Sequence, residues 1–406
     1  MESIQVIGNK CVGCRSCEQV CPKLCIQIKA NKEGFLYPDV DENLCVRCGI
    51  CAKHCPAAIG MQRAGEGCGN IGMQDRYADE RKPLKAFGLK NKNQEQLFHS
   101  ASGGASDVLA RAVVNEGGSV FGCAWSPELK AEHVEIIRED ELWKIQSSKY
   151  VQSDTGNTYS LVKERLNEGK KVLFTGTPCQ VAGLYAFLGG KNYDNLYTID
   201  LICHGVPSPK LLEKYFAYLE DVMGEKIETY NFRSKEKRGW GTQYRYRAET
   251  ENKKRTGLSV FDKYGAHFKK GDCYRECCYQ CDYANLSRRG DITVGDFWGI
   301  DSVNSKFSSP MGVSSLLINT EKGLELMSKI KNRAEIVEVS VESVCLKKGN
   351  LREPAGRPDD RDTFYEQIDE ADFVKNLKVG LQMKERIKAI IPRAVTVGLK
   401  RILTHR

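Results

Sequence analysis

The feature that most constrains this chain is a run of cysteines that occurs twice near its start. The first copy of the pattern C-x2-C-x2-C-x3-C-P consists of Cys11, Cys14, Cys17, Cys21 and Pro22. The second copy begins 34 residues later and consists of Cys45, Cys48, Cys51, Cys55 and Pro56. Three closely spaced thiolates on one loop can hold three corners of an iron–sulfur cube, and the fourth corner needs a ligand from elsewhere. The repeat therefore predicts two 4Fe-4S clusters.

In the two-cluster bacterial ferredoxin pattern, the fourth cysteine of each run binds the other cluster. We therefore expect the ligands of the first cluster to be Cys11, Cys14, Cys17 and Cys55. The ligands of the second would be Cys45, Cys48, Cys51 and Cys21. Zinc sites use two separated cysteine pairs, and a thiol redox site needs only one pair, so both alternatives explain the repeat less well. Because such clusters exchange single electrons, residues 1–62 are predicted to form an α+β ferredoxin-like electron relay.

The formal charge of the chain is +8, from 61 Lys and Arg against 53 Asp and Glu. Residues 375–406 alone carry nine Lys or Arg against one Glu, so residues 1–374 balance at 52 against 52. A broad basic surface of the kind that coats DNA or RNA is therefore excluded for the body of the chain. No nucleic-acid partner is expected.

The first residues show no basic start followed by an apolar core, so no secretory signal is visible. The longest uncharged apolar run, residues 173–190, contains a proline and four glycines. It is typical of a strand, a turn and a helix rather than of a membrane span. We therefore expect a cytoplasmic protein, in which clustered cysteines bind metal rather than form disulfides.

From Leu97 onward, short β-type runs alternate with helical ones, which predicts a larger α/β domain after a polar linker at residues 63–96. Strands are expected near residues 120–123, 134–137, 171–174, 196–203, 292–294 and 315–318. Helices are expected near residues 106–115, 158–167, 181–188, 209–222 and 321–331. The chain contains no G-x-G-x-x-G turn, P-loop or H-E-x-x-H motif, so Rossmann-type nicotinamide binding and zinc hydrolysis lose their usual support.

Two further cysteines, Cys179 and Cys203, end predicted strands of this domain. The carboxyl ends of strands in an open α/β sheet gather at one rim, and a helix N-terminus lowers the pKa of a thiol. A nearby C-x2-C pair would complete the ligands of a third 4Fe-4S cluster, held by Cys179, Cys203, Cys278 and Cys281. The spacing leaves open whether Cys273 or Cys277 replaces one of them. It also leaves open a zinc site at the pair and simple packing of the strand-end cysteines.

Four segments of the body resemble one protein family. They are Thr-Gly-Thr-Pro-Cys-Gln (175–180), Ile-Cys-His-Gly-Val-Pro-Ser (202–208), Cys-Tyr-Gln-Cys (278–281) and Asp-Ile-Thr-Val-Gly-Asp-Phe-Trp-Gly (291–299). In this order they resemble the coenzyme F420 hydrogenase/dehydrogenase beta-subunit family, in its FrhB-like branch with an N-terminal ferredoxin domain. The likeness extends over residues 1–345 and implies that the larger α/β domain is a FrhB-like flavin and iron–sulfur domain.

The resemblance implies an oxidoreductase that carries FAD besides its clusters. It would pass electrons to or from an organic substrate or a coenzyme F420-like carrier, and a bacterial branch of similar architecture occurs in polysaccharide biosynthesis. A flavin suits this task because it converts between one-electron and two-electron transfer. The alternative is a non-catalytic electron-transfer subunit that serves a separate reductase or dehydrogenase. Either role needs a redox partner protein or a small-molecule electron carrier, and the direction of electron flow stays open.

The flavin contacts that we predict come from the resemblance and from one helix start. Ser100-Ala-Ser-Gly-Gly-Ala105 resembles a Ser-Gly-Gly segment of the family and precedes a predicted helix, whose free amides can cradle a pyrophosphate. An ordinary capping loop is the alternative. The candidate cofactor residues are Ser100, Ser102, Gly103, Gly104, Lys149 and Thr177. No catalytic residue is assigned, although His204 is either a proton donor or a structural histidine.

The basic residues at the end of the chain alternate with apolar ones at helical spacing. Apolar side chains at 383, 387, 390 and 391, and again at 395, 399, 402 and 403, lie opposite Lys and Arg. This pattern is typical of helices on an anionic membrane surface, which would place the protein peripherally on the inner face of the membrane. A helix packed on its own domain and a solvated tail are the alternatives. After the linker, the predicted segments are therefore 97–170 and 171–345 (FrhB-like), 346–374 (helical extension) and 375–406 (basic tail).

Overall fold

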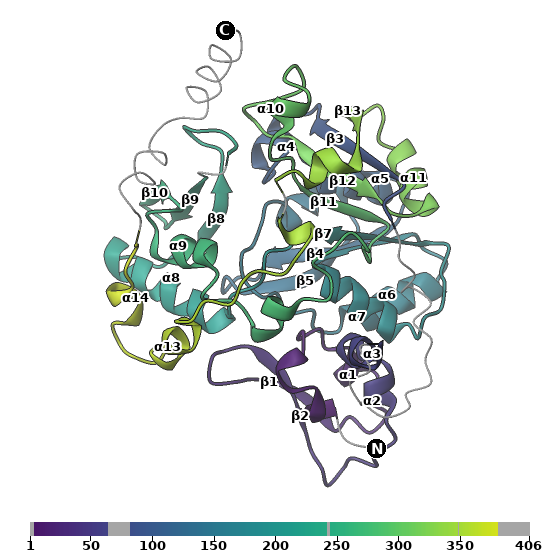
Figure 1. Ribbon diagram of the computed structural model, residues 1–406, viewed down its shortest axis with the longest axis vertical. Coiled ribbons are helices and arrows are strands. Elements are labelled where there is room, and N and C mark those ends of the chain that lie inside the picture. Colours follow the sequence, from purple (N-terminus) through teal and green to yellow (C-terminus); the bar gives the residue numbers. More distant parts are fainter. Residues whose placement is uncertain (1–3, 64–81, 242–243, 348, 381–406) are drawn as a thin grey trace.

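The computed structural model describes residues 4–63, 82–241, 244–347 and 349–380. The strands of these residues form three separate sheets, of two, three and eight strands. Figure 1 shows the cysteine-rich N-terminal domain (purple) at one end of the molecule, with the largest sheet and its helices beyond it and the three-stranded sheet to one side.

The N-terminal domain repeats the duplication of its sequence. Each cysteine loop is followed by a single helical turn, and left-handed backbone occurs at the same two positions of each loop: at Gly13 and Arg15, and 34 residues later at Arg47 and Gly49. Such backbone curls a loop tightly around whatever it encloses. The elements of the domain are η1 (Ile4–Lys10), α1 (Ser16–Gln19), the antiparallel hairpin β1 (Ile26–Ala30) and β2 (Leu36–Val40), α2 (Ile50–Lys53) and α3 (Pro56–Arg63).

The largest sheet is mixed, in the order β13-β3-β12-β11-β7-β6-β4-β5. Its strands are β3 (Lys85–Asn91), β4 (Ser119–Trp125), β5 (Ala131–Ile136), β6 (Val172–Gly176), β7 (Leu196–Leu201), β11 (Ile292–Asp296), β12 (Ser314–Ile318) and β13 (Ala334–Val339). The central strands β4, β6, β7 and β11 are parallel, and the four others pair antiparallel. The larger domain is therefore a mixed α/β domain.

Helices cover both faces of this sheet. Val120 and Leu173 share one core with α5 (Ala105–Val114) and α11 (Glu321–Ser328). Their neighbours Phe121 and Phe174 share another core with α6 (Thr158–Asn167) and α7 (Pro178–Phe187). Because successive strand residues point to opposite faces, the two helix pairs lie on opposite sides of the sheet.

The strands and helices expected from the sequence occur, but the expected linker is wrong in its second half. β3 lies within residues 63–96 and pairs with both β12 and β13. Its sequence, Lys-Ala-Phe-Gly-Leu-Lys-Asn, has lysines at positions 85 and 90 and a central glycine, so it resembles a charged connector more than a strand. The boundary expected at residue 170 falls between the paired strands β4 and β6, so both FrhB-like segments share one sheet.

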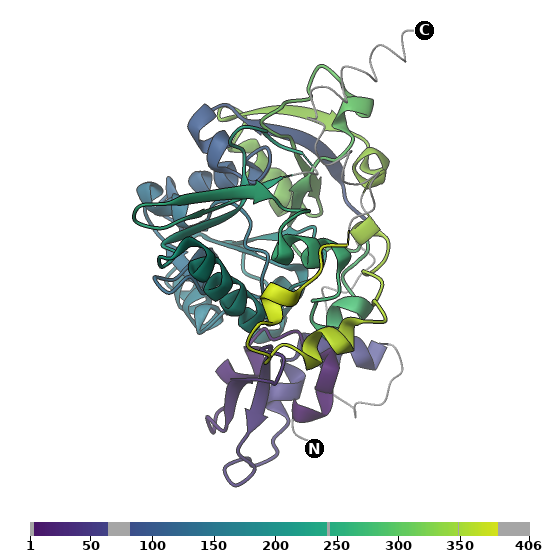
Figure 2. The same ribbon diagram turned by 90° about the vertical axis from the view of Figure 1, so that its left-hand side faces the viewer.

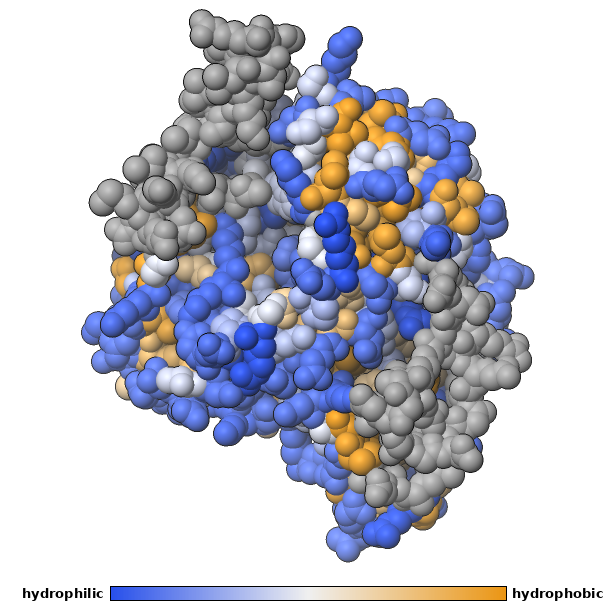
Figure 3. All heavy atoms as spheres, viewed as in Figure 1, coloured by the Kyte–Doolittle hydropathy of each residue, from blue (hydrophilic) through white to orange (hydrophobic). Residues whose placement is uncertain are grey.

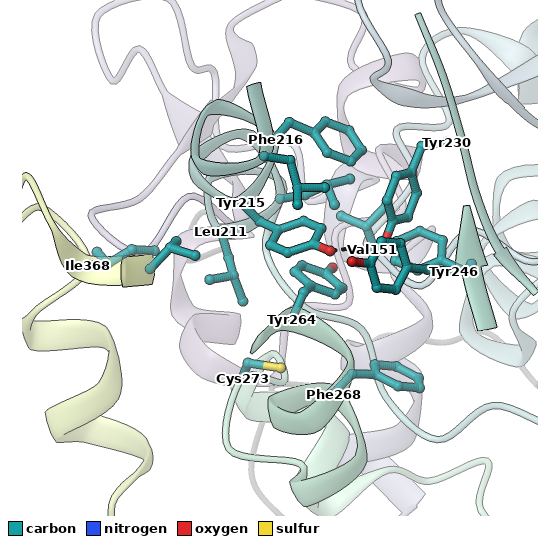
Figure 4. Close-up of a cluster of buried hydrophobic side chains, with 14 of the residues drawn as sticks. Val151, Leu211, Tyr215, Phe216, Tyr230, Tyr246, Tyr264, Phe268, Cys273 and Ile368 are labelled. Atoms are coloured by element: carbon teal, nitrogen blue, oxygen red, sulfur yellow. Dashed lines mark hydrogen bonds between the residues drawn. The ribbon is translucent and has the colours of Figure 1, made fainter. Parts of the chain in front are cut away.

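The smaller sheet builds an aromatic core that the sequence did not predict. Its order is β10-β9-β8, all antiparallel. Its elements are β8 (Thr229–Ser234), β9 (Arg245–Glu249) and β10 (Lys254–Leu258), with α8 (Pro209–Met223) and α9 (Lys263–Lys270) beside them. Figure 4 shows Tyr215, Tyr230 and Tyr264 with their rings turned toward one another in this core.

The segment expected as a helical extension, residues 346–374, is mostly irregular. It begins after α12 (Val341–Cys345) and contains η4 (Gly349–Leu351), α13 (Arg361–Glu366) and the start of α14 (Phe373–Asn376). Phe364 and Phe373 close the aromatic core, and Figure 2 shows this segment (yellow) reaching the N-terminal domain. Most of the expected tail, from residue 381 onward, lies outside the described residues, and with it the expected membrane contact.

Among the described helices, none is both long and apolar enough to cross a membrane. The face drawn in Figure 3 is largely hydrophilic, with hydrophobic side chains gathered over the part of the sheet that holds β3, β12 and β13.

The N-terminal domain is fixed to the rest of the molecule at several places, two of which contain ion pairs. At the first, the turn between β1 and β2 enters the aromatic core, where Phe35 is fully buried with its ring 5.6 Å from that of Tyr365. Beside it, Arg361 of α13 makes two contacts to the Glu33 carboxylate, at 2.6 and 2.7 Å. At the second, Arg15 forms an ion pair with Asp154. The cysteine loops are thereby held in one orientation toward the large sheet.

Candidate iron–sulfur and cofactor site

The cysteines of the N-terminal repeat form two groups. Among the neighbouring thiols, those of Cys55 and Cys11 have the largest electrostatic effect on the pKa of Cys14. The corresponding neighbours of Cys51 are Cys48 and Cys21. The second group also lines a small cavity, formed in part by Cys21, Cys25, Cys45, Cys48 and Cys51. In each group the fourth cysteine of one run approaches the three others of the opposite run. This is the arrangement that the crossed ligand sets require.

The chemistry of these thiols fits metal ligation. Burial raises the pKa of Cys55 to about 12, so a free thiol there stays protonated at neutral pH. A bound iron replaces that proton, because thiolate is the ligand form. Cys25 lies 3.4 Å from the Cys21 sulfur and is buried, in keeping with the packing role of a cysteine outside both motifs.

The two groups lie at different depths. Cys14 of the first group lies against α7, where a Cβ atom on Gly183 would come within 2.9 Å of its sulfur. The glycine at that position lets the cysteine loop approach the helix closely. In the second group Cys48 is exposed, and its neighbour Val46 keeps 59% of its surface open to solvent. The first group therefore faces the body of the protein and the second faces outward.

Five cysteines of the body meet where β6 and β7 end. Cys179 is the second residue of α7, shortly after β6. Cys203 follows β7, and the other three lie on or just after η3 (Glu276–Gln280). Each acts electrostatically on others of the group, and all five line one cavity: Cys179, Cys203, Cys277, Cys278 and Cys281. The structure thus brings together the four predicted ligands and adds Cys277 to them.

The spacing of these thiols bears on the zinc alternative. Among the residues that the structure describes, no group of three or more His, Cys, Asp or Glu side chains is close enough to hold one metal ion. Ligands of an iron–sulfur cube surround a wider core than the ligands of a single tetrahedral ion. The third cluster and the zinc site at the C-x2-C pair both stay predictions.

Cys273, which the sequence left open as a ligand, lies in a different environment. It is fully buried in the aromatic core, near Tyr264 and Phe268 in Figure 4. Its carbonyl accepts a hydrogen bond from the Tyr365 hydroxyl at 2.6 Å. Cys273 therefore packs as a small apolar residue, which leaves Cys277 as the cysteine that could replace one of the four predicted ligands.

The cavity lined by the thiols has a volume of about 600 Å³ and extends across the sheet rim to the start of α5. Its wall includes Ser102, Gly104 and Ser106 at that end and Cys179 and Cys203 at the other. Its size is within the range of cofactor sites, which are typically about 300–1,000 Å³. One cavity therefore joins the expected cluster site to the expected phosphate-binding loop.

The start of α5 has the features of a phosphate-binding site. Gly104 precedes the helix in left-handed backbone (φ 82°), and no side chain caps the helix. A Cβ atom at Gly103 would come within 2.1 Å of the Leu89 carbonyl, so the loop lies directly on β3. Ser100 and Ser102 donate hydrogen bonds to the carbonyls of Gln96 and Val313. These serines shape the loop. The Ala105 amide donates to the Ser314 hydroxyl at 3.4 Å, and the next residue of the helix, Ser106, lines the cavity.

A carboxylate near this helix start is neutralised. Asp107 lies in the first turn of α5, where a free negative charge would repel a phosphate. Its carboxylate accepts hydrogen bonds from Arg111 at 3.0 Å and from Gln146 at 2.6 Å. The ion pair with Arg111 thus keeps the helix start favourable to an anion.

Lys149 and Thr177 line the cavity, but their polar groups have protein partners. The Lys149 ammonium donates to three backbone carbonyls, those of Cys123, Lys144 and Gln146. Burial lowers the pKa of Lys149 to about 8. The Thr177 hydroxyl lies 3.1 Å from the Cys179 sulfur. Lys149 therefore fixes the loop around it, and Thr177 fixes the helix start that carries Cys179.

His133 of β5 also reaches this cavity, and sequence reasoning missed it. Its Nε2 lies 3.1 Å from the Thr175 carbonyl, so the hydrogen is assigned to Nε2 and Nδ1 is left as an acceptor. That buried Nδ1 has no hydrogen-bond partner within the described residues. Burial lowers the pKa of His133 to about 4. A histidine on an inward-facing strand position was the only signal in the sequence.

We expect His133→Gln to make the protein less sensitive to mild acid. The pKa of His133 in the fold is below that of the unfolded chain, so the unfolded chain takes up a proton first and stability falls as pH drops from about 6.5 toward about 4. Between about pH 7 and about pH 5, the parent should lose about 2 kcal/mol more than the variant. Urea unfolding at both pH values measures this. The exposed His99→Gln is the control, and equal pH sensitivity of parent and His133→Gln would contradict the assignment.

Comparison with known proteins agrees with this division of the chain. Residues 169–344 match the family model that describes the C-terminal part of the coenzyme F420 hydrogenase/dehydrogenase beta subunit. Over these residues the chain is similar to that family. Residues 10–59 match the 4Fe-4S dicluster domain. Both matches confirm the resemblance stated from the sequence, and they contain all twelve cysteines predicted as ligands.

Two individual proteins show the extent of the likeness. Pyruvate synthase subunit PorD of Methanothermobacter marburgensis is 41% identical over 56 residues, which cover 14% of this chain and only 59% of that protein. A chain of the F420-reducing NiFe hydrogenase complex from Methanosarcina barkeri has a TM-score of 0.45 and 19% identity, over 73% of this chain and 95% of that chain.

Proposed function

We propose that this chain is an iron–sulfur flavoprotein oxidoreductase, which moves electrons between its ferredoxin domain and an organic substrate or an F420-like carrier. One observation carries the proposal: a single cavity has five thiols at one end and the uncapped start of α5 at the other. Four of the thiols would hold a third 4Fe-4S cluster, and the helix start would hold the pyrophosphate of FAD. When bound, a flavin supplies the conversion between one-electron and two-electron transfer.

The placement of the cysteine groups supports an order for the relay. The outward second group is where an external carrier exchanges electrons. The first group lies between it and the body, with Cys14 against α7 and Cys179 at the start of the same helix. From Cys179 the cavity leads to the start of α5. The residues therefore favour the order second group, first group, third group, flavin, in either direction of flow.

The flavin part of the proposal predicts a charge effect at α5. Ser106 lines the cavity in the first turn of this helix, so Ser106→Glu places a carboxylate where a pyrophosphate would bind. We expect the affinity for FAD to fall by about tenfold or more, since a first-turn anion competes with the phosphate for the same helix end. Titration of flavin-free protein with FAD, followed by flavin fluorescence, measures this.

The control is Ser328→Glu, which adds the same charge on the exposed end of α11. The reconstituted parent should bind FAD and about twelve irons, four for each cluster. A parent that binds all the iron but no flavin would overturn the flavoenzyme proposal and leave the relay.

That outcome would favour a second candidate, a non-catalytic electron-transfer subunit of a larger enzyme. The likeness to a pyruvate synthase subunit favours this candidate, because that likeness extends over only 56 residues, or 14% of the chain. Turnover by the isolated chain with a chemical reductant separates the two. Testing deazaflavins and lipid-linked or nucleotide-linked sugars as acceptors in this assay also tests the role in polysaccharide biosynthesis.

A further inference from the structure

Four arginine side chains are almost completely buried among the described residues: Arg233, Arg275, Arg288 and Arg361. Three of them have a carboxylate partner, at 2.9 Å for Arg233 and Asp296, 3.0 Å for Arg288 and Asp200, and 2.6 Å for Arg361 and Glu33.

Arg275 differs from the other three. It has no exposed surface, and within the described residues no carboxylate lies at ion-pair distance from it. Its guanidinium donates instead to three neutral oxygens, those of the Cys11 carbonyl at 2.7 Å, the Leu36 carbonyl at 2.9 Å and the Gln152 side chain at 3.2 Å. It also lies 4.0 Å from the ring centre of Tyr37.

A buried guanidinium without a negative partner is costly, because hydrogen bonds to neutral groups do not replace its lost hydration. Arginine stays protonated in proteins, so the charge cannot be removed by titration. Negative charge must therefore come from groups close to Arg275 when the protein is complete.

The groups next to Arg275 are the thiols of two proposed clusters. Cys11 of the first group and Cys277 of the third group both contact its guanidinium. The cysteine loop also bends around it, since a Cβ atom on Gly13 would lie 3.2 Å from Nη1. Four thiolates leave a 4Fe-4S cluster with net negative charge, and each electron that it accepts adds one more.

We propose that Arg275 is a positioning residue between the first and third clusters, whose charge makes each of them easier to reduce. This inference rests on the cluster-binding part of the proposed function. The guanidinium replaces solvent between the two sites and favours their reduced states over their oxidised states. A residue that only joined the Cys11 loop to η3 by hydrogen bonds would not need a charge. The effect of the charge on the cluster potentials can therefore be tested separately from the structural role.

The decisive variant is Arg275→Gln, which removes the charge but keeps hydrogen-bonding capacity. We expect the equilibrium constant for electron uptake by the first and third clusters to fall by about tenfold, equal to about 59 mV for a one-electron couple. The second cluster, held at the outer end by Cys45, Cys48, Cys51 and Cys21, should keep its potential. Redox titration of the complete protein, followed by electron paramagnetic resonance, reads the clusters in one sample.

Two further variants separate charge from geometry. Gln152→Glu gives Arg275 a carboxylate partner of nearly the same shape at the cost of the long hydrogen bond to the Val12 carbonyl (3.4 Å). The same two potentials should fall. Arg361→Gln loosens the seat of the N-terminal domain without removing a charge beside the thiols, and should leave all the potentials unchanged. Arg275→Lys keeps the charge and should stay close to the parent.

The inference is overturned if Gln152→Glu leaves the potentials of the first and third clusters where they are in the parent. It is also overturned if Arg361→Gln lowers them as much as Arg275→Gln does, because docking alone would then explain the effect. Failure of the cluster assignment itself looks different: the parent would contain fewer than about twelve irons before any variant is made.

Discussion

Cys203→Ser is expected to lower the bound iron of the reconstituted protein by about a third, from about twelve to about eight per chain. Cys203 follows β7 and shares the cavity with the four other thiols of the third group. A serine is a poor ligand for iron, whereas the two ferredoxin groups lie in a separate domain and should remain loaded. Iron analysis measures the loss, and the visible spectrum shows the clusters that remain.

The same variant should break the path to the flavin. Reduction of bound FAD by an electron donor that acts on the ferredoxin domain should become slow, while both ferredoxin clusters are still reduced at the parent rate. Cys345→Ser is the matched control, since Cys345 is buried in a different core. An unchanged iron content in Cys203→Ser would show that these thiols do not hold a cluster. Cys277→Ser and Cys278→Ser, made singly, identify the fourth ligand as the one whose loss costs iron.

Phe35→Ala should destabilise the contact between the ferredoxin domain and the aromatic core by about 3–5 kcal/mol. This is the usual cost of deleting a fully buried phenylalanine ring. Phe35 lies at the tip of the β1–β2 hairpin, and its ring is enclosed by the aromatic core beside Tyr365. Because the ring joins two parts of the molecule, its loss should weaken their contact as well as the core. Urea unfolding gives the change in stability. Hydrogen exchange of the hairpin amides shows whether the domain detaches.

The control for this variant is Leu24→Ala in the same domain, where the side chain keeps 81% of its surface exposed. Its effect should stay within about 0.5 kcal/mol. Phe35→Ala could instead change the stability as little as Leu24→Ala and leave the hairpin protected from exchange. The attachment of the ferredoxin domain would then have to depend on Arg361 and Arg15.

The cysteine sites were the most predictable part of this protein. Cys11 to Cys55 follow a short-range rule, because three ligands on one loop fix their own geometry. Cys179 and Cys203 could be placed at one rim because parallel strands end on the same side of a sheet. Short strands with strong apolar character, such as β6, were found for a similar reason.

What the sequence did not reveal depends on contacts between distant residues. β3 was mistaken for a connector because only its neighbours β12 and β13 make it a strand. The role of Arg275 could not be predicted from the sequence, because it depends on a hydrogen bond to a carbonyl 264 positions away and on the lack of a carboxylate partner among the described residues. The roles of Lys149 and Thr177 changed for the same reason: their partners, not their residue types, determine what they do.

The attachment of the ferredoxin domain to residues from the later part of the chain has a consequence for the synthesis of the protein. The domain is made first, but the residues that grip it, Arg275 and Arg361, are added hundreds of positions later. Since domains generally fold as they emerge from the ribosome, the cysteine loops exist for a period before their final surroundings do. Iron and sulfide delivery to Cys14 is unobstructed during that interval and becomes restricted once α7 packs against its loop. Metal loading after folding should therefore be slower than loading during translation, with the same final iron content.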